Sequence, residues 1–341
     1  MQGTILVATA GQGVIRSSDN GATWARTPLG QALEFDGVVR CIVIHPHQPE
    51  VVFAGADVGL VRSHDAGHSW TRVDGPFNDM QIWTIAIDPV DSDFMLVGSG
   101  APARAYVWRS TDGGATWDEL PPRIPEHCAG VSKPRILTSA VDPVDRDQLW
   151  FGIEEGGLWR SGDRGDTWLR IDKHPKQVPD TVTNSDVHAV LVLAGEPKTH
   201  LVVTVNAIWT SRDGGESWQR TVAAKEFGYR YARTVAALAD GKTVLFACGD
   251  STPGTVTRIF KSGDQAESWQ ETTFDVAPNS TVWGFAVHPS DPSLVFAGTK
   301  YGHLFRSTDG GGSWAKEWRE FPEITALAWT PAIARADNAT H

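Results

Sequence analysis

Short apolar runs recur along the chain and are separated by clusters of Gly, Pro, Asn and Asp. The clearest copies of one kind of run end at a Pro turn and are 38–46 (VVRCIVIHP), 81–89 (QIWTIAIDP), 134–143 (PRILTSAVDP) and 281–289 (TVWGFAVHP). Looser copies of the same run cover 187–194 and 233–239. A shorter apolar run follows, as in 51–55, and then a run that ends in a basic residue and Ser, as in 158–161. Short apolar runs between turn residues are typical of β-strands. The pattern therefore predicts an all-β protein.

An octapeptide with the consensus S-x-D-x-G-x-[ST]-W follows these runs. It occurs seven times, at 17–24, 63–70, 110–117, 161–168, 211–218, 262–269 and 307–314. Only Ala266 departs from the consensus glycine, and successive tryptophans lie 46, 47, 51, 50, 51 and 45 residues apart. A period near 50 is that of a four-stranded propeller blade. The repeat therefore predicts a seven-bladed β-propeller of four-stranded antiparallel blades.

Each octapeptide is expected to form the turn between the third and fourth strands of a blade. The Asp side chain can cap backbone amides within the turn, and the Gly tolerates a positive φ. The Trp then enters the fourth strand and is expected to insert between neighbouring blades, where its large surface is buried. We therefore interpret the octapeptides as structural and not as catalytic.

The two ends of the chain complement each other. Residues 4–24 supply the second, third and fourth strands of a blade, whereas 323–331 (EITALAWTP) supplies a first strand alone. The seventh blade is therefore expected to form when the N-terminal strands, within 4–27, pair with the C-terminal strand 323–331, which removes open sheet edges. We expect one propeller domain over 1–331 and a loose tail over 332–341.

The seven octapeptides resemble the BNR or Asp-box repeats of sialidases, sortilin-type receptor propellers and photosystem assembly propellers. The resemblance covers nearly the whole chain and implies the propeller fold, but the same scaffold hosts unrelated activities. Resemblance to sialidases would imply six blades and an Arg-Ile-Pro motif before the first box. Here that tripeptide occurs at 123–125, after the third box. A sialidase-like glycosidase is therefore the third-ranked functional hypothesis.

Composition restricts the partners. The 41 acidic residues exceed the 30 basic ones, and a net charge of −11 opposes binding to nucleic acid or to an anionic membrane. The three cysteines are far apart and no H-E-x-x-H spacing occurs, so we expect neither a metal nor a cofactor. Residues 1–7 fit a strand better than a signal peptide, which predicts a cytoplasmic protein.

The strand order places the boxes on one face of the ring. The starts of the first strands lie on the other face, together with the loops between blades and between second and third strands. Two of these loops, 121–133 and 172–186, are long, and variable loops commonly carry function. Residues at the starts of the first strands should converge on the mouth of the central channel.

Arginines and aromatic residues at these positions predict a funnel for a small anionic or polar ligand, since guanidinium groups bind carboxylate and phosphate in a bidentate manner. The substrate-binding candidates are Arg40, Trp83, Arg135, Tyr231, Arg233, Trp283 and Tyr301. Blade packing is the alternative role of the two tryptophans. The catalytic candidates are Asp57, Glu154, Glu155, His188 and Glu323. Adjacent strand residues point to opposite faces, so at most one of Glu154 and Glu155 is expected to face the funnel.

Two functional hypotheses rank above the sialidase. The first is a small-molecule enzyme, a hydrolase or lyase, that uses a carboxylate or His188 as general acid or base in the funnel. The second is a non-catalytic propeller that binds a peptide or protein partner on the same face. In a purely structural alternative, the arginines and glutamates of the funnel neutralise one another and no ligand is involved.

Overall fold

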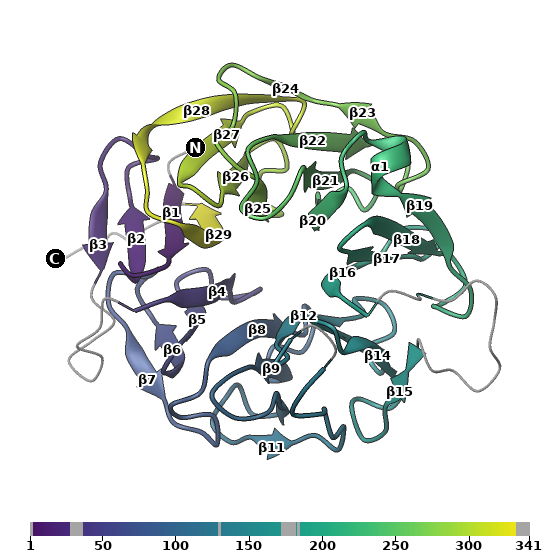
Figure 1. The fold of residues 1–341 in the computed structure, drawn as a ribbon. Coiled ribbons are helices and arrows are strands. Elements are labelled where there is room, and N and C mark those ends of the chain that lie inside the picture. The colour runs from purple at the N-terminus through teal and green to yellow at the C-terminus, as the bar shows by residue number, and fades with distance from the viewer. Residues whose placement is uncertain (1–2, 28–36, 129–130, 172–181, 183–184, 332–341) are drawn as a thin grey trace, which may run out of the picture.

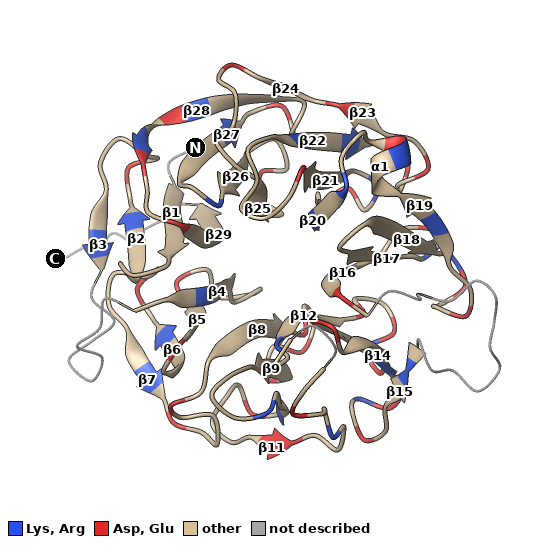
Figure 2. Ribbon diagram, in the orientation of Figure 1, with Lys and Arg blue, Asp and Glu red and all other residues tan. Residues whose placement is uncertain are grey.

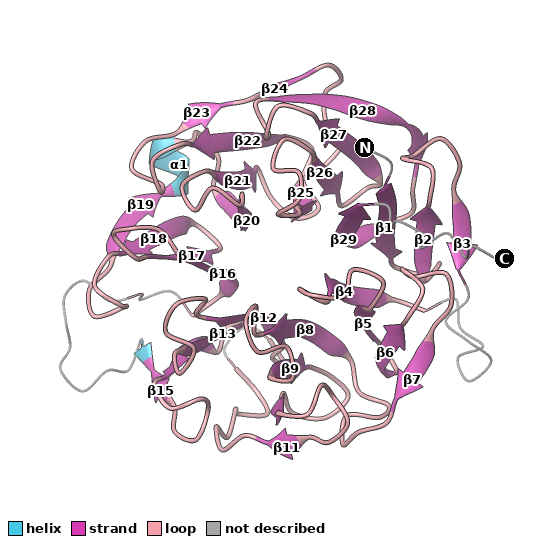
Figure 3. Cartoon of the chain, turned by 180° about the vertical axis from the view of Figure 1, so that it is seen from behind, coloured by secondary structure: helices cyan, strands magenta, loops and turns pink. Residues whose placement is uncertain are grey.

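Seven small sheets surround a central channel in the computed structural model, which describes residues 3–27, 37–128, 131–171, 182 and 185–331. Figure 1 shows the sheets as the blades of a ring, and Figure 3 shows the same ring from behind. The innermost strand of each blade lies beside the innermost strand of the next. The prediction of an all-β, seven-bladed propeller is therefore confirmed.

Blades are numbered here in chain order, and the ring-closing blade is the seventh. Blade 1 contains β4 (Val39–Ile44), β5 (Val52–Ala56), β6 (Gly59–Ser63) and β7 (Thr71–Val73). Blade 2 contains β8 (Ile82–Ile87), β9 (Met95–Ser99), β10 (Val107–Ser110) and β11 (Asp118–Glu119). Blade 3 contains β12 (Ile136–Val141), β13 (Leu149–Ile153), β14 (Gly157–Ser161) and β15 (Leu169–Arg170).

The remaining blades follow the same order. Blade 4 contains β16 (Val187–Leu193), β17 (Thr199–Thr204), β18 (Ala207–Ser211) and β19 (Gln219–Val222), followed by the short helix α1 (Ala223–Glu226). Blade 5 contains β20 (Tyr231–Ala237), β21 (Val244–Gly249), β22 (Thr257–Ser262) and β23 (Gln270–Glu271). Blade 6 contains β25 (Val282–Ala286), β26 (Val295–Thr299), β27 (His303–Ser307) and β28 (Ser313–Glu320), with β24 (Thr273–Phe274) added parallel to β28 as an unpredicted fifth strand.

Both chain ends build blade 7. It contains β29 (Ile324–Pro331), β1 (Gly3–Thr9), β2 (Val14–Ser17) and β3 (Ala25–Thr27), in that spatial order. The β1–β29 pairing runs antiparallel from Gly3 opposite Pro331 to Thr9 opposite Ile324. The predicted closure by the two ends is therefore confirmed. The predicted tail, 332–341, lies outside the described residues, so the domain boundary at 331 stays a prediction.

The box turns satisfy their own polar groups. In the box of blade 2, the Asp112 carboxylate accepts hydrogen bonds from the Thr116 amide (2.8 Å) and from the Thr116 and Ser110 hydroxyls (2.6 and 2.8 Å). The Ser110 hydroxyl in turn accepts from the Gly114 amide at 2.9 Å. Hydrogen bonds from Thr116 and Ser110 lower the pKa of Asp112 to about 2. Ala266, which replaces the consensus glycine in one box, still adopts φ +69°, a conformation that favours glycine.

The box tryptophans join each blade to the one before it. The Trp70 indole donates to the Thr27 hydroxyl of blade 7 at 3.3 Å, and the Trp314 indole donates to the Thr272 hydroxyl at 3.1 Å. Trp218 makes an edge-to-face contact with Trp150 of the preceding blade. Trp70, Trp218 and Trp314 are buried, as the sequence predicted, whereas Trp24, Trp117, Trp168 and Trp269 are only partly buried.

Helical structure is minimal. Within the portion of the chain that the structure describes, no helix is long and apolar enough to cross a membrane.

Removal of β29 should open the ring. A chain that ends at Pro322 leaves the backbone of β1 without its partner strand, and an unpaired edge promotes aggregation. We expect the truncated chain to aggregate or unfold, as measured by size-exclusion chromatography and thermal melting. A truncated chain that stays monomeric with an unchanged Tm would contradict the closure.

Replacement of a buried box tryptophan should destabilise the fold strongly. Trp314 is 2% exposed, so Trp314→Ala should lower the free energy of unfolding by about 3–5 kcal/mol. Trp318 on the same strand is 68% exposed and donates one hydrogen bond to the Gly21 carbonyl, so Trp318→Ala, the matched control, should cost only about 1 kcal/mol. Chemical denaturation measures both. Equal losses would argue against a packing role for the box.

Candidate functional site

A β-bulge occurs near the start of every innermost strand. In each blade the register with the next strand skips one residue, which therefore has no partner. Such a bulge re-aims the side chain of the extra residue and is common next to functional sites. The seven bulge residues, which we call the bulge ring, are Arg40, Trp83, Leu137, His188, Arg233, Trp283 and Thr325.

The strands are tightly packed at these bulges. Gly98 of β9 pairs with Thr84, the residue after the Trp83 bulge. A Cβ atom on Gly98 would lie 2.7 Å from the Thr84 side chain and 2.8 Å from that of Ile136 in the next blade. A larger residue at position 98 would therefore push blades 2 and 3 apart.

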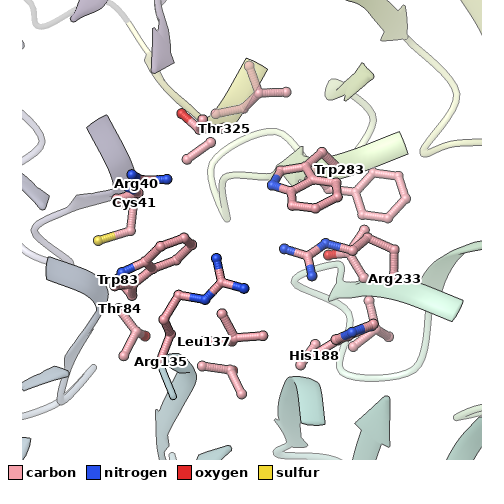
Figure 4. Close-up of a pocket in the computed structure, with 18 of the residues that line it drawn as sticks. Arg40, Cys41, Trp83, Thr84, Arg135, Leu137, His188, Arg233, Trp283 and Thr325 are labelled. Atoms are coloured by element: carbon pink, nitrogen blue, oxygen red, sulfur yellow. The ribbon is translucent and has the colours of Figure 1, made fainter. Parts of the chain in front are cut away.

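All seven bulge residues line one cavity of about 820 Å³ in the central channel. Figure 4 shows them around a common opening, with the guanidinium groups of Arg135 and Arg233 directed into it. Four further lining residues each precede a bulge residue by two positions: Arg135, Asp186, Tyr231 and Glu323. Basic positions also mark the inner strands β4 and β20 in Figure 2. The repeat thus converges polar side chains from all seven blades on one cavity.

Most of the sequence-predicted site residues line this cavity. They are Arg40, Trp83, Arg135, Glu154, His188, Tyr231, Arg233, Trp283 and Glu323. Arg135 and Glu323 are not the blade equivalents of Arg40, however, because Leu137 and Thr325 occupy the bulge positions of their blades.

Three candidates lie outside the cavity lining. Tyr301 is 55% exposed, and Asp57 contacts the site only through Arg40. Glu155 occupies the turn between β13 and β14 at φ +56° and accepts a hydrogen bond from the Ser185 hydroxyl at 2.8 Å. Of the Glu154–Glu155 pair, therefore, only Glu154 lines the cavity.

Two arginines lie against Trp83, and each is held by a carboxylate. The guanidinium carbons of Arg40 and Arg135 are 4.3 and 4.5 Å from the Trp83 ring centroid. Arg40 donates two hydrogen bonds to Asp57, at 2.7 and 3.0 Å. Arg135 donates two to Glu154. These bidentate pairs neutralise the charges of both arginines when no ligand is bound.

Two further cations lie against the ring of Trp283. The guanidinium carbon of Arg233 lies 3.5 Å from its ring centroid and the Lys300 ammonium lies 4.0 Å from it. Lys300 forms an ion pair with Glu323. Burial lowers the pKa of Lys300, the Glu323 carboxylate raises it, and the charges of Arg233 and Arg40 lower it further. Cations from different blades are therefore close enough to repel one another.

Arg233 differs from the other cations of the cavity. Among the described residues it forms no ion pair within 4 Å, and its buried Nε has no hydrogen-bond partner. Burial lowers the pKa of Arg233, and the nearby Tyr231 and Asp186 only partly oppose this. A guanidinium stays protonated in proteins, so Arg233 contributes a positive charge that no carboxylate of the described residues contacts directly.

The buried His188 and the partly buried Asp186 form a pair beside Arg233. The Nε2 atom of His188 lies 3.2 Å from the Asp186 carboxylate, and its Nδ1 lies 2.8 Å from the Ala232 carbonyl. Burial raises the pKa of Asp186, but the hydrogen bond from His188 and the charges of His188, Arg233 and Arg135 hold it below its usual value. Asp186 is thus an ionised carboxylate, and both ring nitrogens of His188 are engaged.

Asp186 was not among the site candidates from the sequence, and Lys300 was expected only as one of several loop residues at the channel mouth, without a role. Asp186 ends a long loop, and the available signal was its position two residues before His188, the same offset as Arg135, Tyr231 and Glu323. Lys300 lies in the loop between β26 and β27. The repeat positions do not predict how far this loop reaches into the channel.

Comparison with known proteins supports the repeat assignment. The family model for sortilin, neurotensin receptor 3, matches residues 12–129. A xyloglucanase from a Paenibacillus species is 28% identical over 87% of this chain but only 32% of its own length. The chain thus spans about a third of the length of that relative. The photosystem II assembly lipoprotein Ycf48 from a Synechococcus species is 24% identical, over 72% of this chain and 79% of its own length.

A solved structure shows the same fold. The GH74 enzyme of Niastella koreensis superposes with a TM-score of 0.64 at 21% identity, over 82% of this chain and 45% of that chain. The chain is therefore a seven-bladed propeller that resembles sortilin-Vps10 and BNR-type propellers and is similar in sequence to a xyloglucanase and to Ycf48.

Proposed function

We propose that this propeller binds an anionic ligand in its central channel, with the guanidinium of Arg233 as the anchor for a carboxylate or phosphate group. The observation that carries this proposal is the stacked Arg233, which lacks the carboxylate partner that Arg40, Arg135 and Lys300 each have among the described residues. A guanidinium presents several N–H donors in a fixed plane that matches a carboxylate or phosphate.

The aromatic faces favour an anion over a neutral sugar. Sugar rings stack on free aromatic faces, but the Trp83 ring already contacts Arg40 and Arg135, and the Trp283 ring already contacts Arg233 and Lys300. A neutral sugar would have to displace these cations. An anion would instead pair with Arg233, whose charge no carboxylate of the described residues contacts directly.

The ion pairs of the cavity favour binding over glycoside hydrolysis. A glycosidase needs one carboxylic acid that stays protonated and a second carboxylate at a set distance. Glu154 and Glu323 pair with cations, and the pKa of Asp186 is below its usual value. Among the described residues, therefore, no carboxyl group of this cavity fits the role of the protonated acid that such chemistry requires, despite the sequence similarity to the xyloglucanases.

A hydrolase or lyase remains an alternative hypothesis, and it needs a group that is free to exchange a proton. His188 is the natural candidate, but Asp186 and the Ala232 carbonyl engage both of its nitrogens. The relative of comparable length, Ycf48, has a name that describes an assembly role and no catalysis. Both points favour a binding protein.

The paired and unpaired arginines should differ in their contribution to stability. Arg135→Met leaves Glu154, whose side chain is 18% exposed, without its partner, so the Tm should fall. Arg233→Met keeps the apolar stem over Trp283, breaks no ion pair among the described residues and removes repulsion, so the Tm should stay level or rise. Differential scanning calorimetry measures both variants. A large loss in Arg233→Met alone would indicate that Arg233 serves the fold.

Small anions should stabilise the wild-type protein through Arg233. We expect acetate or phosphate to raise the Tm and to bind measurably by isothermal titration, because ligands of the native state stabilise it. Arg233→Met should weaken that binding about 10- to 100-fold, the effect of one charge-assisted contact. Arg72→Met, which breaks an exposed pair with Asp79 outside the cavity, is the matched control and should bind normally.

The proposal fails if no small carboxylate or phosphate shifts the wild-type Tm, or if Arg233→Met binds as tightly as Arg72→Met. Release of reducing sugar from xyloglucan by the purified protein would favour the enzymatic alternative.

A further inference from the structure

The channel wall next to the bulge ring is apolar. The same cavity that Arg233 lines is also bounded by Val43, Ile85, Ala189, Val235, Phe285 and Leu327, one from each of six blades. These residues follow the bulge positions along the innermost strands by one to three residues. The cavity thus joins a charged mouth to an apolar interior.

Several polar groups in this interior are already engaged. The Thr84 hydroxyl is 2.9 Å from the Ser139 hydroxyl of the next blade, and the Thr138 hydroxyl accepts from the Val190 amide at 3.1 Å. Thr325 donates to the Val39 carbonyl. Burial raises the pKa of Cys41 to about 12, so its thiol is neutral. These side chains have their main polar contacts within the protein, which leaves the interior suited to an apolar group.

The charges at the mouth determine the charge of the ligand. Arg40, Arg135 and Lys300 are neutralised by Asp57, Glu154 and Glu323. The Asp186 carboxylate lies 3.2 Å from Nε2 of His188, whose Nδ1 faces the Ala232 carbonyl, so among the described residues Asp186 contacts His188 and forms no ion pair with Arg233. The charge of Arg233 remains. One negative charge completes the site, whereas a second would meet the three surrounding carboxylates that line the cavity.

We infer that the ligand is a singly charged carboxylate with an apolar tail, whose carboxylate lies at Arg233 beside Trp283 and whose tail lies along the apolar interior. This inference rests on the proposed anion-binding function and adds the class and orientation of the ligand. A cavity of about 820 Å³ accommodates a medium-chain acid or the last residues of a peptide with an apolar C-terminus.

A homologous series tests the tail. Acetate, butyrate, hexanoate and octanoate are titrated into the wild-type protein by calorimetry. Each added methylene that enters an apolar interior should raise the affinity about 2- to 4-fold. Hexanol, with the tail but no charge, and succinate, with a second charge, should both bind more weakly than hexanoate. Arg233→Met should reduce hexanoate binding toward that of hexanol.

A variant of the wall provides a second readout. Leu137 is a half-buried bulge residue outside the hydrophobic core clusters, so Leu137→Asn should fold. If the tail contacts the wall, this change should lower hexanoate affinity several-fold and leave acetate affinity unchanged. The exposed Val144→Asn, on the turn between β12 and β13, is the control and should affect neither ligand.

The outcomes separate the inference from the proposed function. If acetate and hexanoate bind equally and both depend on Arg233, the anion-binding site is supported and the inference of an apolar tail is contradicted. If succinate binds more tightly than hexanoate, the inference that the ligand carries a single negative charge is contradicted. If no acid binds, both proposals fail. A hexapeptide that ends in Leu distinguishes the sources: tighter binding than octanoate, lost on C-terminal amidation, indicates a peptide end, and weaker binding indicates a free acid.

Discussion

Antiparallel pairing of β1 with β29 is the contact on which the whole architecture depends. The blades are not covalently linked in a circle, so without this pairing the first and last blades would present open edges. Closure fixes the radius of the ring and therefore the distance of each innermost strand from the axis. Only in a closed ring do side chains from seven blades meet in one cavity. The site is thus a consequence of closure.

Two parts of the repeat have opposite requirements. The box turns are nearly identical because each must satisfy the same hydrogen bonds between Ser, Asp and backbone amides. The bulge positions share a backbone geometry but hold Arg, Trp, Leu, His, Arg, Trp and Thr. A fixed backbone with variable side chains is the expected arrangement where a scaffold carries a site that is specific to one protein. We therefore expect the chemistry of this propeller to depend on its bulge ring and not on its boxes.

The architecture is predictable from the amino-acid sequence because its signals are local and repeated. The box, its spacing and the complementary chain ends each follow from turn chemistry and strand period, and together they determine blade number and closure. Five of the seven bulge residues are recognisable as channel residues for the same reason. Leu137 and Thr325 are not, because the charged Arg135 and Glu323, two residues earlier, are the more conspicuous candidates in their strands. A one-residue bulge leaves no signature in composition.

The sequence allowed the arginines and glutamates of the funnel to neutralise one another, but which side chains pair could not be predicted in the same way. Side-chain pairing depends on how far loops and side chains reach into the channel, which periodicity does not report. This reach determines that Arg40 binds Asp57, that Glu323 binds Lys300 and that Arg233 has no carboxylate partner among the described residues. These pairings changed the functional interpretation. Candidate acids from the sequence became the partners of cations, and one arginine emerged as the position for an anion.

A crystal structure of the protein grown with hexanoate tests the central claim most directly. The account predicts electron density for a carboxylate within hydrogen-bond distance of the Arg233 guanidinium, beside the ring of Trp283, with the ion pairs Arg40–Asp57 and Arg135–Glu154 intact. Density for the carboxylate at Arg40 or Arg135 with those pairs broken, or an empty cavity in a crystal that binds the anion elsewhere, would contradict it.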